Sequence, residues 1–373
     1  MISSRPAVLL VGDTLNLGGT EGQFTELACR LDRSRWDIEV ACVRPEGSLR
    51  PKLEASGFQP WHCGPTSFKS PRLLSRIAAL ARRMKSRGVA VVHSFDFYTN
   101  ILALPAARLA GVRAIIGSQR NLGNLRSPTQ QMIHNLSLRL ATHIQVNSEA
   151  VRDRVLQSRS IRQEQVTVIP NGVDLTRFSP RTGTPRNGSG LVVGTLSNLR
   201  PEKGLADLIQ AVGMVRHRWP DVRLVIWGEG PLRRELVSLV AALNLAASVE
   251  LPGSTNVPEA ALRDLDIFVL PSLSEASSNG LMEAMATALP VVATLVGGNP
   301  GLVEDENTGL LVPPGDSAAL AKAIIRLIED RASAARLGEQ ARAHAHLTFG
   351  MESMVARTEA FYVRVLGERA KNR

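Results

Sequence analysis

Cysteine and long apolar runs are both scarce in this chain of 373 residues. The three cysteines, Cys29, Cys42 and Cys63, are odd in number and show no CxxC spacing. They fit buried free thiols in a reducing compartment better than a disulfide framework. No apolar run approaches the roughly 18 residues that span a bilayer, and the run AVLLVG at residues 7–12 indicates a first strand rather than a secretion signal. These shortages predict a cytoplasmic protein.

Acidic residues are nearly missing from residues 55–148, which contain 12 lysines and arginines and a single acid, Asp96. Residues 1–180 have a net charge of +11, from 24 basic and 13 acidic side chains, while the remainder has 20 and 21, a net charge of −1. The first half is therefore expected to meet an anionic partner. Because the basic region has few aromatic residues and no recognised nucleic-acid-binding module, we expect no nucleic acid as a partner.

Short runs rich in valine and isoleucine alternate with longer amphipathic segments along the chain. Strands that are almost continuously apolar, separated by helices, predict an α/β fold with parallel sheets covered on both faces. Six strands in each half suggest two Rossmann-like domains that face each other across a cleft. The expected strands are AVLLVG, DIEVACV, VAVVHS, RAIIGS, THIQVN and VTVIP, then GLVVGTL, VRLVIWG, SVELPG, DIFVLPS, LPVVAT and GLLVP, and the expected helices include 70–87, 127–140, 203–217 and 316–330.

A domain boundary is expected near residue 180, where SPRTGTPRNGSG at 179–190 is dense in proline, glycine, serine and threonine. We expect a first domain at residues 1–175 and a second at residues 176–349. The last segment, at about 350–373, is predicted as a helix that could pack back onto the first domain.

Two glutamates, Glu275 and Glu283, stand eight positions apart in PSLSEASSNGLMEAMATALPVVAT, between two strand-like runs. Ligands of open parallel sheets bind outside the carboxyl ends of the strands, and Glu275 lies on such a loop. Residues 277–279 are suitable N-caps for a helix, so Glu283 alone could simply complement the helix dipole. Glu275 precedes the cap, and Gly280 lets the backbone approach a ligand closely. The pair therefore indicates a binding site.

Two cations, Arg200 and Lys203, flank the predicted start of another helix in GTLSNLRPEKGL at 194–205, where Pro201 is well placed to open it. Cations gain nothing from the dipole of a helix start, but together with it they form a strong anion site. The alternative is a solvated pair of charges. A further stretch, GGTEGQ at 18–23, lacks the spacing of a dinucleotide or phosphate loop and by itself indicates only a tight turn.

Taken in order, these motifs resemble the retaining glycosyltransferases of the GT-B fold in family 4, also described as glycosyl transferases group 1. The similarity runs along most of the chain and is dense from residue 168 to residue 314. Each motif is common by itself, and only the order is specific. The motifs are GGTEG at 18–22, VIPNGVD at 168–174, LRPEKG at 199–204, GEGP at 228–231, LPG at 251–253, the pair Glu275 and Glu283, EAMA at 283–286, PVVAT at 290–294 and ENTGLLVPPGD at 306–316.

The resemblance implies a site for a nucleotide-diphospho-sugar donor, with uridine the commonest base in the family. Arg200 and Lys203 would hold the diphosphate and neutralise the leaving group. Glu283 would bind the ribose hydroxyls, and Glu275 would contact hydroxyls of the transferred sugar.

The resemblance also implies that backbone takes part in donor binding. The backbone at Asn279, Gly280 and Leu281 would lie near the phosphate, and the turn at Gly18 and Gly19 would close on the donor from the first domain. Preorganised cations and a helix start stabilise a departing diphosphate where its charge develops, so neither a metal nor a bound cofactor is expected. The only DxD, at 264–266, comes before its strand rather than after it.

Two departures from the family pattern leave the sugar and the acceptor open. Many relatives place a histidine at the end of the fifth strand of the first domain, where this chain has IIGSQRN with Arg120. Arg120 and His93, which follows VAVV, are the candidates for the acceptor side, although a lone histidine at a strand end is more often structural. Gly301 stands where the family commonly has a glutamate in VGGxPE.

The segment at 70–88 is predicted as an amphipathic helix with a basic face. A packed helix with a solvated basic side is one interpretation. Docking on anionic lipid headgroups is the other, since each cation near such a surface contributes roughly 1 kcal/mol. The apolar stripe is Leu73, Ile77, Leu80 and Met84, and the basic face is Arg72, Arg76, Arg83 and Arg87.

The sequence therefore predicts a retaining, metal-independent glycosyltransferase that serves cell-surface polysaccharide or glycolipid synthesis. It would move a sugar from a nucleotide diphosphate to a glycan or lipid-linked acceptor, in the cytoplasm or peripherally at the cytosolic face of a membrane. A nucleotide-sugar epimerase or phosphorylase on the same fold, or a non-enzymatic nucleotide-sugar-binding scaffold, remain the alternatives.

Overall fold

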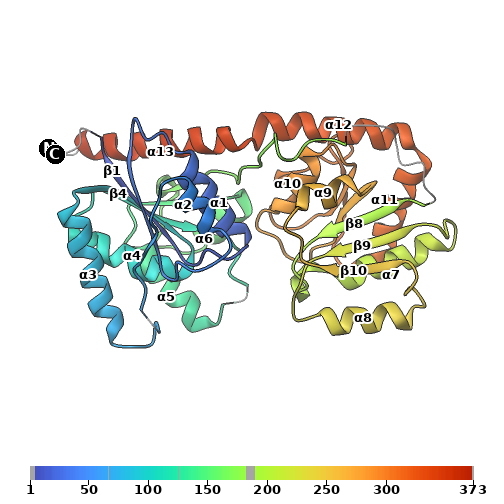
Figure 1. The fold of residues 1–373 in the computed structure, drawn as a ribbon, viewed down its shortest axis with the longest axis horizontal. Helices are drawn as coiled ribbons and strands as arrows, with labels where there is room; N and C mark the ends of the chain where they lie inside the picture. The colour runs from blue at the N-terminus through green and yellow to red at the C-terminus, as the bar shows by residue number, and fades with distance from the viewer. Residues whose placement is uncertain (1–4, 66, 125, 182–189, 372–373) are drawn as a thin grey trace. The chain divides into compact units, whose positions relative to one another are not determined.

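The computed structural model describes residues 5–65, 67–124, 126–181 and 190–371. The chain divides into two compact units, one made of residues 1–172 and 352–373 and the other of residues 173–351. Each unit is built on its own parallel sheet with helices around it, and the strands are blue to green in the first unit and yellow-green to orange in the second (Figure 1). The α/β class and the two parallel sheets expected from the sequence are confirmed. Most of the expected linker at 179–190 lies outside the described residues.

The first unit contains a seven-stranded sheet in the order β3-β2-β1-β4-β5-β6-β7. The six strands predicted for this half are all present, and every residue of the central strand β4 is buried, which explains its continuous apolar pattern. The missed strand, β3, has two residues and no alternation that a sequence pattern could reveal. The strands are β1 (Ala7–Gly12), β2 (Asp37–Cys42), β3 (Trp61–His62), β4 (Val89–Phe95), β5 (Ala114–Gln119), β6 (His143–Val146) and β7 (Val166–Val168).

The helices of the first unit follow the strands as crossover connections. One of them shows its start in the sequence: Pro128 opens α5, and Ser127 caps it by accepting a hydrogen bond from the Gln130 N–H at 3.3 Å. The helices are α1 (Gly19–Arg30), α2 (Arg50–Ala55), α3 (Arg72–Ser86), α4 (Phe97–Ala110), α5 (Pro128–Leu138), α6 (Glu149–Leu156), η1 (Gln163–Gln165) and α13 (Met351–Lys371).

The second unit contains a six-stranded sheet in the order β10-β9-β8-β11-β12-β13, and all six predicted strands are present. In both sheets the order reverses beside the first strand of the unit, next to β1 and next to β8. Such reversal points are where open parallel sheets bind ligands. The strands are β8 (Val192–Leu196), β9 (Arg223–Trp227), β10 (Val249–Gly253), β11 (Ile267–Leu270), β12 (Val291–Thr294) and β13 (Leu310–Val312). The helices are η2 (Pro201–Lys203), α7 (Leu205–Arg216), α8 (Arg233–Ala242), α9 (Pro258–Arg263), α10 (Asn279–Ala286), η3 (Asn299–Gly301), α11 (Ser317–Glu329) and α12 (Arg331–Thr348).

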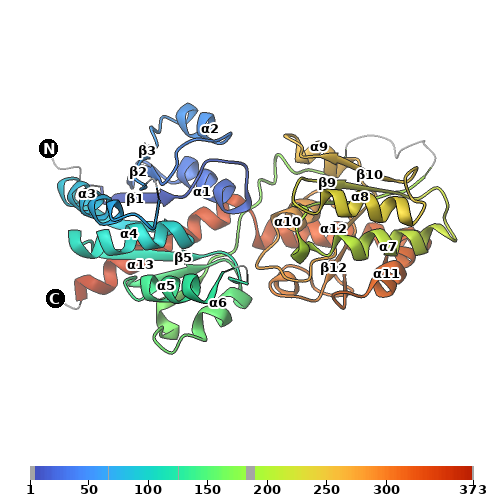
Figure 2. The ribbon, with the colours of Figure 1, turned by 90° about the horizontal axis from the view of Figure 1, so that it is seen from below.

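The C-terminal helix α13 belongs to the first unit, where Figure 2 shows it beside the sheet strands. Its Tyr362 is fully buried and packs edge-on against Trp36, with ring centroids 5.6 Å apart. The Tyr362 hydroxyl lies 2.7 Å from Nδ1 of His93 in β4. A helix distant in sequence thus provides the polar partner of a histidine inside the sheet, and its removal would leave that nitrogen unsatisfied.

Tyr362→Phe is therefore expected to lower the free energy of unfolding by about 1–2 kcal/mol, because it leaves His93 Nδ1 buried without a partner. The measurement is the decrease in Tm by scanning calorimetry. Tyr98→Phe is the matched control, since Tyr98 is 38% exposed. Equal Tm values for the two variants would contradict this role of the hydroxyl.

Candidate functional site

Lys203 and Glu275 form an ion pair in the second unit, with Nζ 2.6 Å from Oε2. Lys203 ends η2, on the connection after β8, and Glu275 lies on the loop after β11. The Glu275 residue is 9% exposed, and the Ser272 hydroxyl also donates to its Oε2, at 3.3 Å. The structure thus brings these two residues together at the reversal point of the sheet.

The two loops are joined through their backbones as well. The Glu202 carbonyl accepts hydrogen bonds from the N–H groups of Leu273 (2.8 Å) and Ser274 (3.2 Å). Gly204 has a φ of +60°, and a Cβ there would lie 2.1 Å from the carbonyl oxygen of Pro271. Glycine is required at this position for both reasons. Lys203 is therefore held by a turn that is locked onto the Glu275 loop.

A third loop, after β12, supports the backbone of Glu275. The Gly298 N–H donates to the Glu275 carbonyl at 3.0 Å, and Gly297, with a φ of +52°, would place a Cβ 1.8 Å from that same oxygen. The buried Asn299 donates to the Thr294 carbonyl at 2.9 Å and fixes the loop to its strand. Our sequence reasoning missed this support, although the paired glycines of VGGNPG were a signal for it.

The start of helix α10 is the next part of the site. Ser278 caps the helix by accepting from the Leu281 N–H at 3.2 Å, as residues 277–279 predicted. Asn279 begins the helix, and Gly280 lies against the end of β8, where a Cβ would be 3.1 Å from the Leu196 carbonyl. The Leu281 N–H is taken by the cap, and the start of α10 is closed against the end of β8.

Arg200 is exposed and occupies the N-cap position of η2. No ion pair of Arg200 is found within the described parts of the chain. The expected α-helix at Glu202 was wrong: residues 201–203 form a short 3-10 turn and α7 begins at Leu205, because Gly204 in the left-handed conformation breaks the helix. Arg200 and Lys203 thus stand before a helix start rather than on it.

Glu283 lies on the fifth residue of α10 and is partly buried. Burial raises the pKa of its carboxyl to about 7, although Arg177 lowers it and Glu259 raises it further. The charged groups that act on Glu283 are Arg177 and Glu259, whereas Lys203 and Glu275 act on each other. A carboxyl whose pKa is raised by desolvation is a common mark of a binding or catalytic site.

In the first unit, Gly18 and Gly19 open helix α1 at the carboxyl end of β1. Gly18 is the N-cap, and its carbonyl accepts from the Gly22 N–H at 2.9 Å. Burial raises the pKa of Glu21, in the first turn of this helix, while the charge of Arg120 lowers it. The first turn of α1 therefore lies near Arg120, one of the two acceptor-side candidates.

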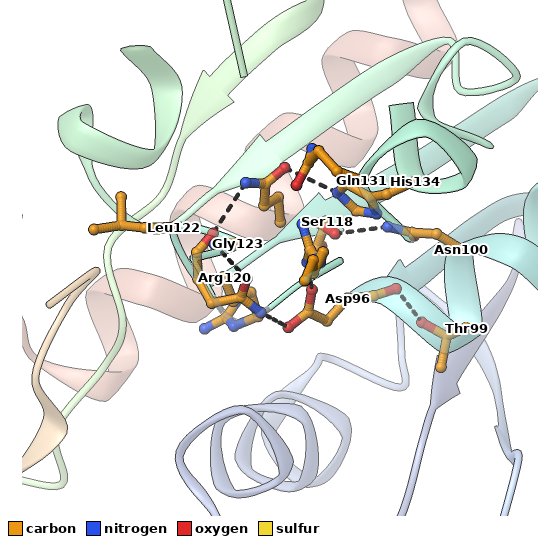
Figure 3. Close-up of polar contacts among 12 residues, drawn as sticks. Asp96, Thr99, Asn100, Ser118, Arg120, Leu122, Gly123, Gln131 and His134 are labelled. Atoms are coloured by element: carbon orange, nitrogen blue, oxygen red, sulfur yellow. Dashed lines mark hydrogen bonds and ion pairs between the residues drawn. The ribbon is translucent and has the colours of Figure 1, made fainter. Parts of the chain in front are cut away.

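Arg120 follows β5 and is 9% exposed (Figure 3). Its guanidinium donates to the side-chain oxygens of Gln145, at 3.3 Å, and Asn171. Its Nε has no hydrogen-bond partner, and within the described residues no carboxylate forms an ion pair with it. Burial lowers the pKa of Arg120 to about 10. Its hydrogen bonds are to neutral groups, although the charges of Asp96 and Glu21 are felt there, so the Nε–H is available to a polar ligand.

His93 is 1% exposed, and both of its ring nitrogens are engaged. Nδ1 lies 2.7 Å from the Tyr362 hydroxyl and Nε2 lies 2.9 Å from the Ser118 hydroxyl. Burial lowers the pKa of His93 to about 3, so the ring is neutral. Strand β4 continues to Phe95, which places His93 inside the sheet rather than at its end. The structure thus favours the structural interpretation, and His93 is not carried into the site proposed below.

Neither a metal-binding cluster nor a membrane-spanning helix is present among the described residues. No group of three or more histidine, cysteine, aspartate or glutamate side chains there could hold a metal ion. No helix in the described part of the chain is both long and apolar enough to cross a membrane.

Solved structures with the same fold span nearly the whole chain. HepE of Anabaena in complex with UDP superimposes with a TM-score of 0.84 at 22% identity, over 96% of this chain and 100% of that chain. Sucrose-phosphate synthase of Thermosynechococcus elongatus gives a TM-score of 0.81 at 22% identity, over 98% and 100% of the two chains. The fold is therefore GT-B, as expected.

Curated relatives differ in how much of the chain they share. WcaL of Escherichia coli K12, named as a colanic acid biosynthesis glycosyltransferase, is 38% identical over 45% of this chain and 43% of its own length. A galactosyltransferase of Escherichia coli, named "UDP-Gal:alpha-D-GlcNAc-diphosphoundecaprenol alpha-1,3-galactosyltransferase", is 26% identical over 81% of this chain and 82% of its own length.

Two family models cover most of the sequence between them. Residues 17–177 match the model described as Glycosyltransferase Family 4, and residues 180–344 match the one described as Glycosyl transferases group 1. The glycine turn at 18–19 lies in the first matched range, and Lys203 and Glu275 lie in the second. The chain belongs to the glycosyltransferases that these two models describe.

Proposed function

We propose that this protein is a retaining glycosyltransferase that needs no metal ion and uses a nucleotide-diphospho-sugar, with a UDP-sugar as the first candidate. The observation that carries the proposal is the contact of Lys203 with Glu275 at the reversal point of the second sheet. An accessible cation and a carboxylate held by three interlocked loops can bind a diphosphate and a sugar side by side. The retaining outcome is supported by the motif set, above all by the spacing of Glu275 and Glu283.

The proposed chemistry concerns the departing diphosphate. When the bond between the sugar and the diphosphate breaks, negative charge develops on the phosphate oxygens, and Lys203 and Arg200 neutralise it. Lys203 is 20% exposed at its side chain, so its ammonium can turn part of its hydrogen-bonding capacity toward a phosphate while Glu275 stays nearby. Glu275 then accepts hydrogen bonds from hydroxyls of the transferred sugar.

The other proposed contacts with the nucleotide-sugar are hydrogen bonds from side chains and from the backbone. Glu283 accepts from the ribose hydroxyls, and the backbone of Asn279 and Gly280 approaches the phosphate at the start of α10. Arg120 lies on the acceptor side.

The identity of donor and acceptor is proposed from relatives. HepE has been solved with UDP and with UDP-glucose, and the Escherichia coli galactosyltransferase is named for a UDP-galactose donor and a diphosphoundecaprenol-linked acceptor. Cell-surface polysaccharide or glycolipid synthesis, with a lipid-linked acceptor, is therefore the proposed setting.

A lipid-linked acceptor agrees with the basic face of α3, although the structure changes which cations are available. Arg87 pairs with Glu39 at 2.5 Å, and Arg83 lies 3.4 Å from the same carboxylate, so the sheet partly neutralises both. Leu74 is 72% exposed on the same helix. We propose that the solvent-exposed side of α3, with the cations that Glu39 does not pair, rests on anionic lipid headgroups at the cytosolic face of a membrane. The exposed cations for which the described residues show no ion pair are Arg72, Arg76, Arg82 and Lys85.

Lys203→Ala and Glu275→Ala are each expected to reduce transfer by about 100-fold or more, because each removes a charged group aimed at the donor. The measurement is product formation from UDP-glucose or UDP-galactose with a lipid-linked GlcNAc-diphosphate acceptor, and NMR of the product should show the donor's anomeric configuration. Lys322→Ala, an exposed lysine of the same unit, is the control. Folding is checked by the Tm of each variant without ligand. The rise in Tm with UDP, which corresponds to about 2.7 kcal/mol of stabilisation at 100 times Kd in the wild type, reports on the donor site. Normal turnover by either site variant refutes the assignment.

Glu283→Gln is expected to stabilise the ligand-free protein above neutral pH. The pKa of Glu283 is raised from 4.5 to about 7 on folding, so folding stability is lost as pH rises from about 4.5 to about 7 and stays lower beyond. The variant has no such loss, and its advantage at pH 8 over pH 5 should be about 1–2 kcal/mol after allowing for partial exposure. Thermal melts at both pH values test this. A difference between variant and wild type that does not change with pH would disprove the assigned pKa.

The charge reversal Arg82→Glu with Lys85→Glu is expected to abolish sedimentation of the protein with vesicles that contain 30% anionic lipid (roughly 1 kcal/mol for each cation removed). Arg83→Gln with Arg87→Gln is the matched control, since Glu39 already pairs with both side chains. Equal binding by the two variants would count against this face.

A further inference from the structure

Asp96 joins the end of β4 to the start of α4 in an unusual backbone conformation. Its φ is +71° and its ψ is −166°, a region that is essentially restricted to glycine. The surroundings hold it there: its carbonyl accepts from the Thr99 hydroxyl at 2.9 Å and from the Asn100 N–H at 3.0 Å. Residues kept in such conformations gather at ligand sites, and β4 borders the reversal point of its sheet.

Capping of α4 does not explain an aspartate at this position, since its side chain makes no capping hydrogen bond to the helix. The carboxylate instead turns toward the segment after β5, as Figure 3 shows. Arg126 Nη2 donates to Oδ1 at 2.9 Å, and the Asn121 side chain donates to Oδ2. The side chain is 20% exposed, whereas that of Arg126 is 8% exposed. With the Phe97 N–H, three donors face the carboxylate, and they use only part of its roughly four lone-pair sites.

The charges around Asp96 are balanced. Arg120 and Arg126 face it, and Glu21 from α1 lies near enough for the two carboxyls to influence each other. Burial raises the pKa of both carboxyls, so their charge is held in a partly desolvated place. Two cations and two acids together favour a neutral ligand rich in hydroxyl groups over a phosphate, which would need an excess of cations.

We propose that Asp96 binds the acceptor sugar, by accepting a hydrogen bond from one of its hydroxyl groups. This inference rests on the proposed function and names a binding residue for it. Asp96 is the only acid among residues 55–148, which form most of the first unit's basic region. A carboxylate that selects a sugar hydroxyl there gives that otherwise basic region its specificity.

The test uses the full-length protein and a panel of neutral probes, the methyl glycosides of glucose, galactose and N-acetylglucosamine, with binding measured by saturation-transfer NMR. Wild type is expected to bind at least one glycoside, and Asp96→Asn and Asp96→Gly to bind it at least tenfold more weakly. Asp153→Asn, a change at an exposed acid of the same unit, should bind as wild type does. Glucose 1-phosphate, added as the charged probe, should bind no more tightly than the best glycoside.

Several outcomes separate this role from others. Undiminished binding by Asp96→Asn, tighter binding of glucose 1-phosphate, or no glycoside binding by wild type would each overturn the proposal. If Asp96 only anchors the segment after β5, Arg126→Gln will weaken glycoside binding as much as Asp96→Gly does, and this also overturns it. The UDP melting experiment tests the donor site independently, so failure of the proposed function and failure of this inference are distinguishable.

Discussion

The hydrogen bonds between the loop at Glu202 and the loop at 273–274 are the constraint on which the proposed donor site depends. Parallel strands deliver their carboxyl ends to one edge of the sheet, but loops at that edge are mobile unless something ties them together. Here the backbone ties them, and the glycines at 204 and 297 make the close approach possible. The ion pair of Lys203 and Glu275 is then preorganised rather than a chance surface contact.

Desolvated acids recur on both sheets. Glu283 in the second unit and Glu21 and Asp96 in the first have carboxyl groups whose pKa is raised by burial. Burying a charge is costly, and a protein keeps such groups where a ligand will supply hydrogen bonds in place of water. Sugar and ribose hydroxyls are suitable donors for this purpose, which agrees with the family to which the chain belongs.

The interior of the first unit also contains a chain of hydrogen bonds between buried polar side chains. His93 connects Tyr362 of the last helix to Ser118 of β5, and the Ser118 hydroxyl donates in turn to Gln145 at 2.9 Å. Gln145 also accepts from Arg120 at 3.3 Å. The helix that closes the chain thus supports the strand that presents Arg120, and the histidine acts inside this network.

The sequence by itself determined twelve strands, the α/β class and the positions of Lys203 and Glu275 on connections that follow strands, because apolar periodicity and motif order are local properties. It could not locate β3, which is too short to have a period, or the true start of α7, where the left-handed Gly204 overrides a proline signal. Tertiary structure alone decided that His93 is interior, that Arg83 and Arg87 are paired by Glu39, and that Asp96 is held at positive φ. The first two depend on partners distant along the chain, and contacts of that kind leave no periodic trace in a single sequence.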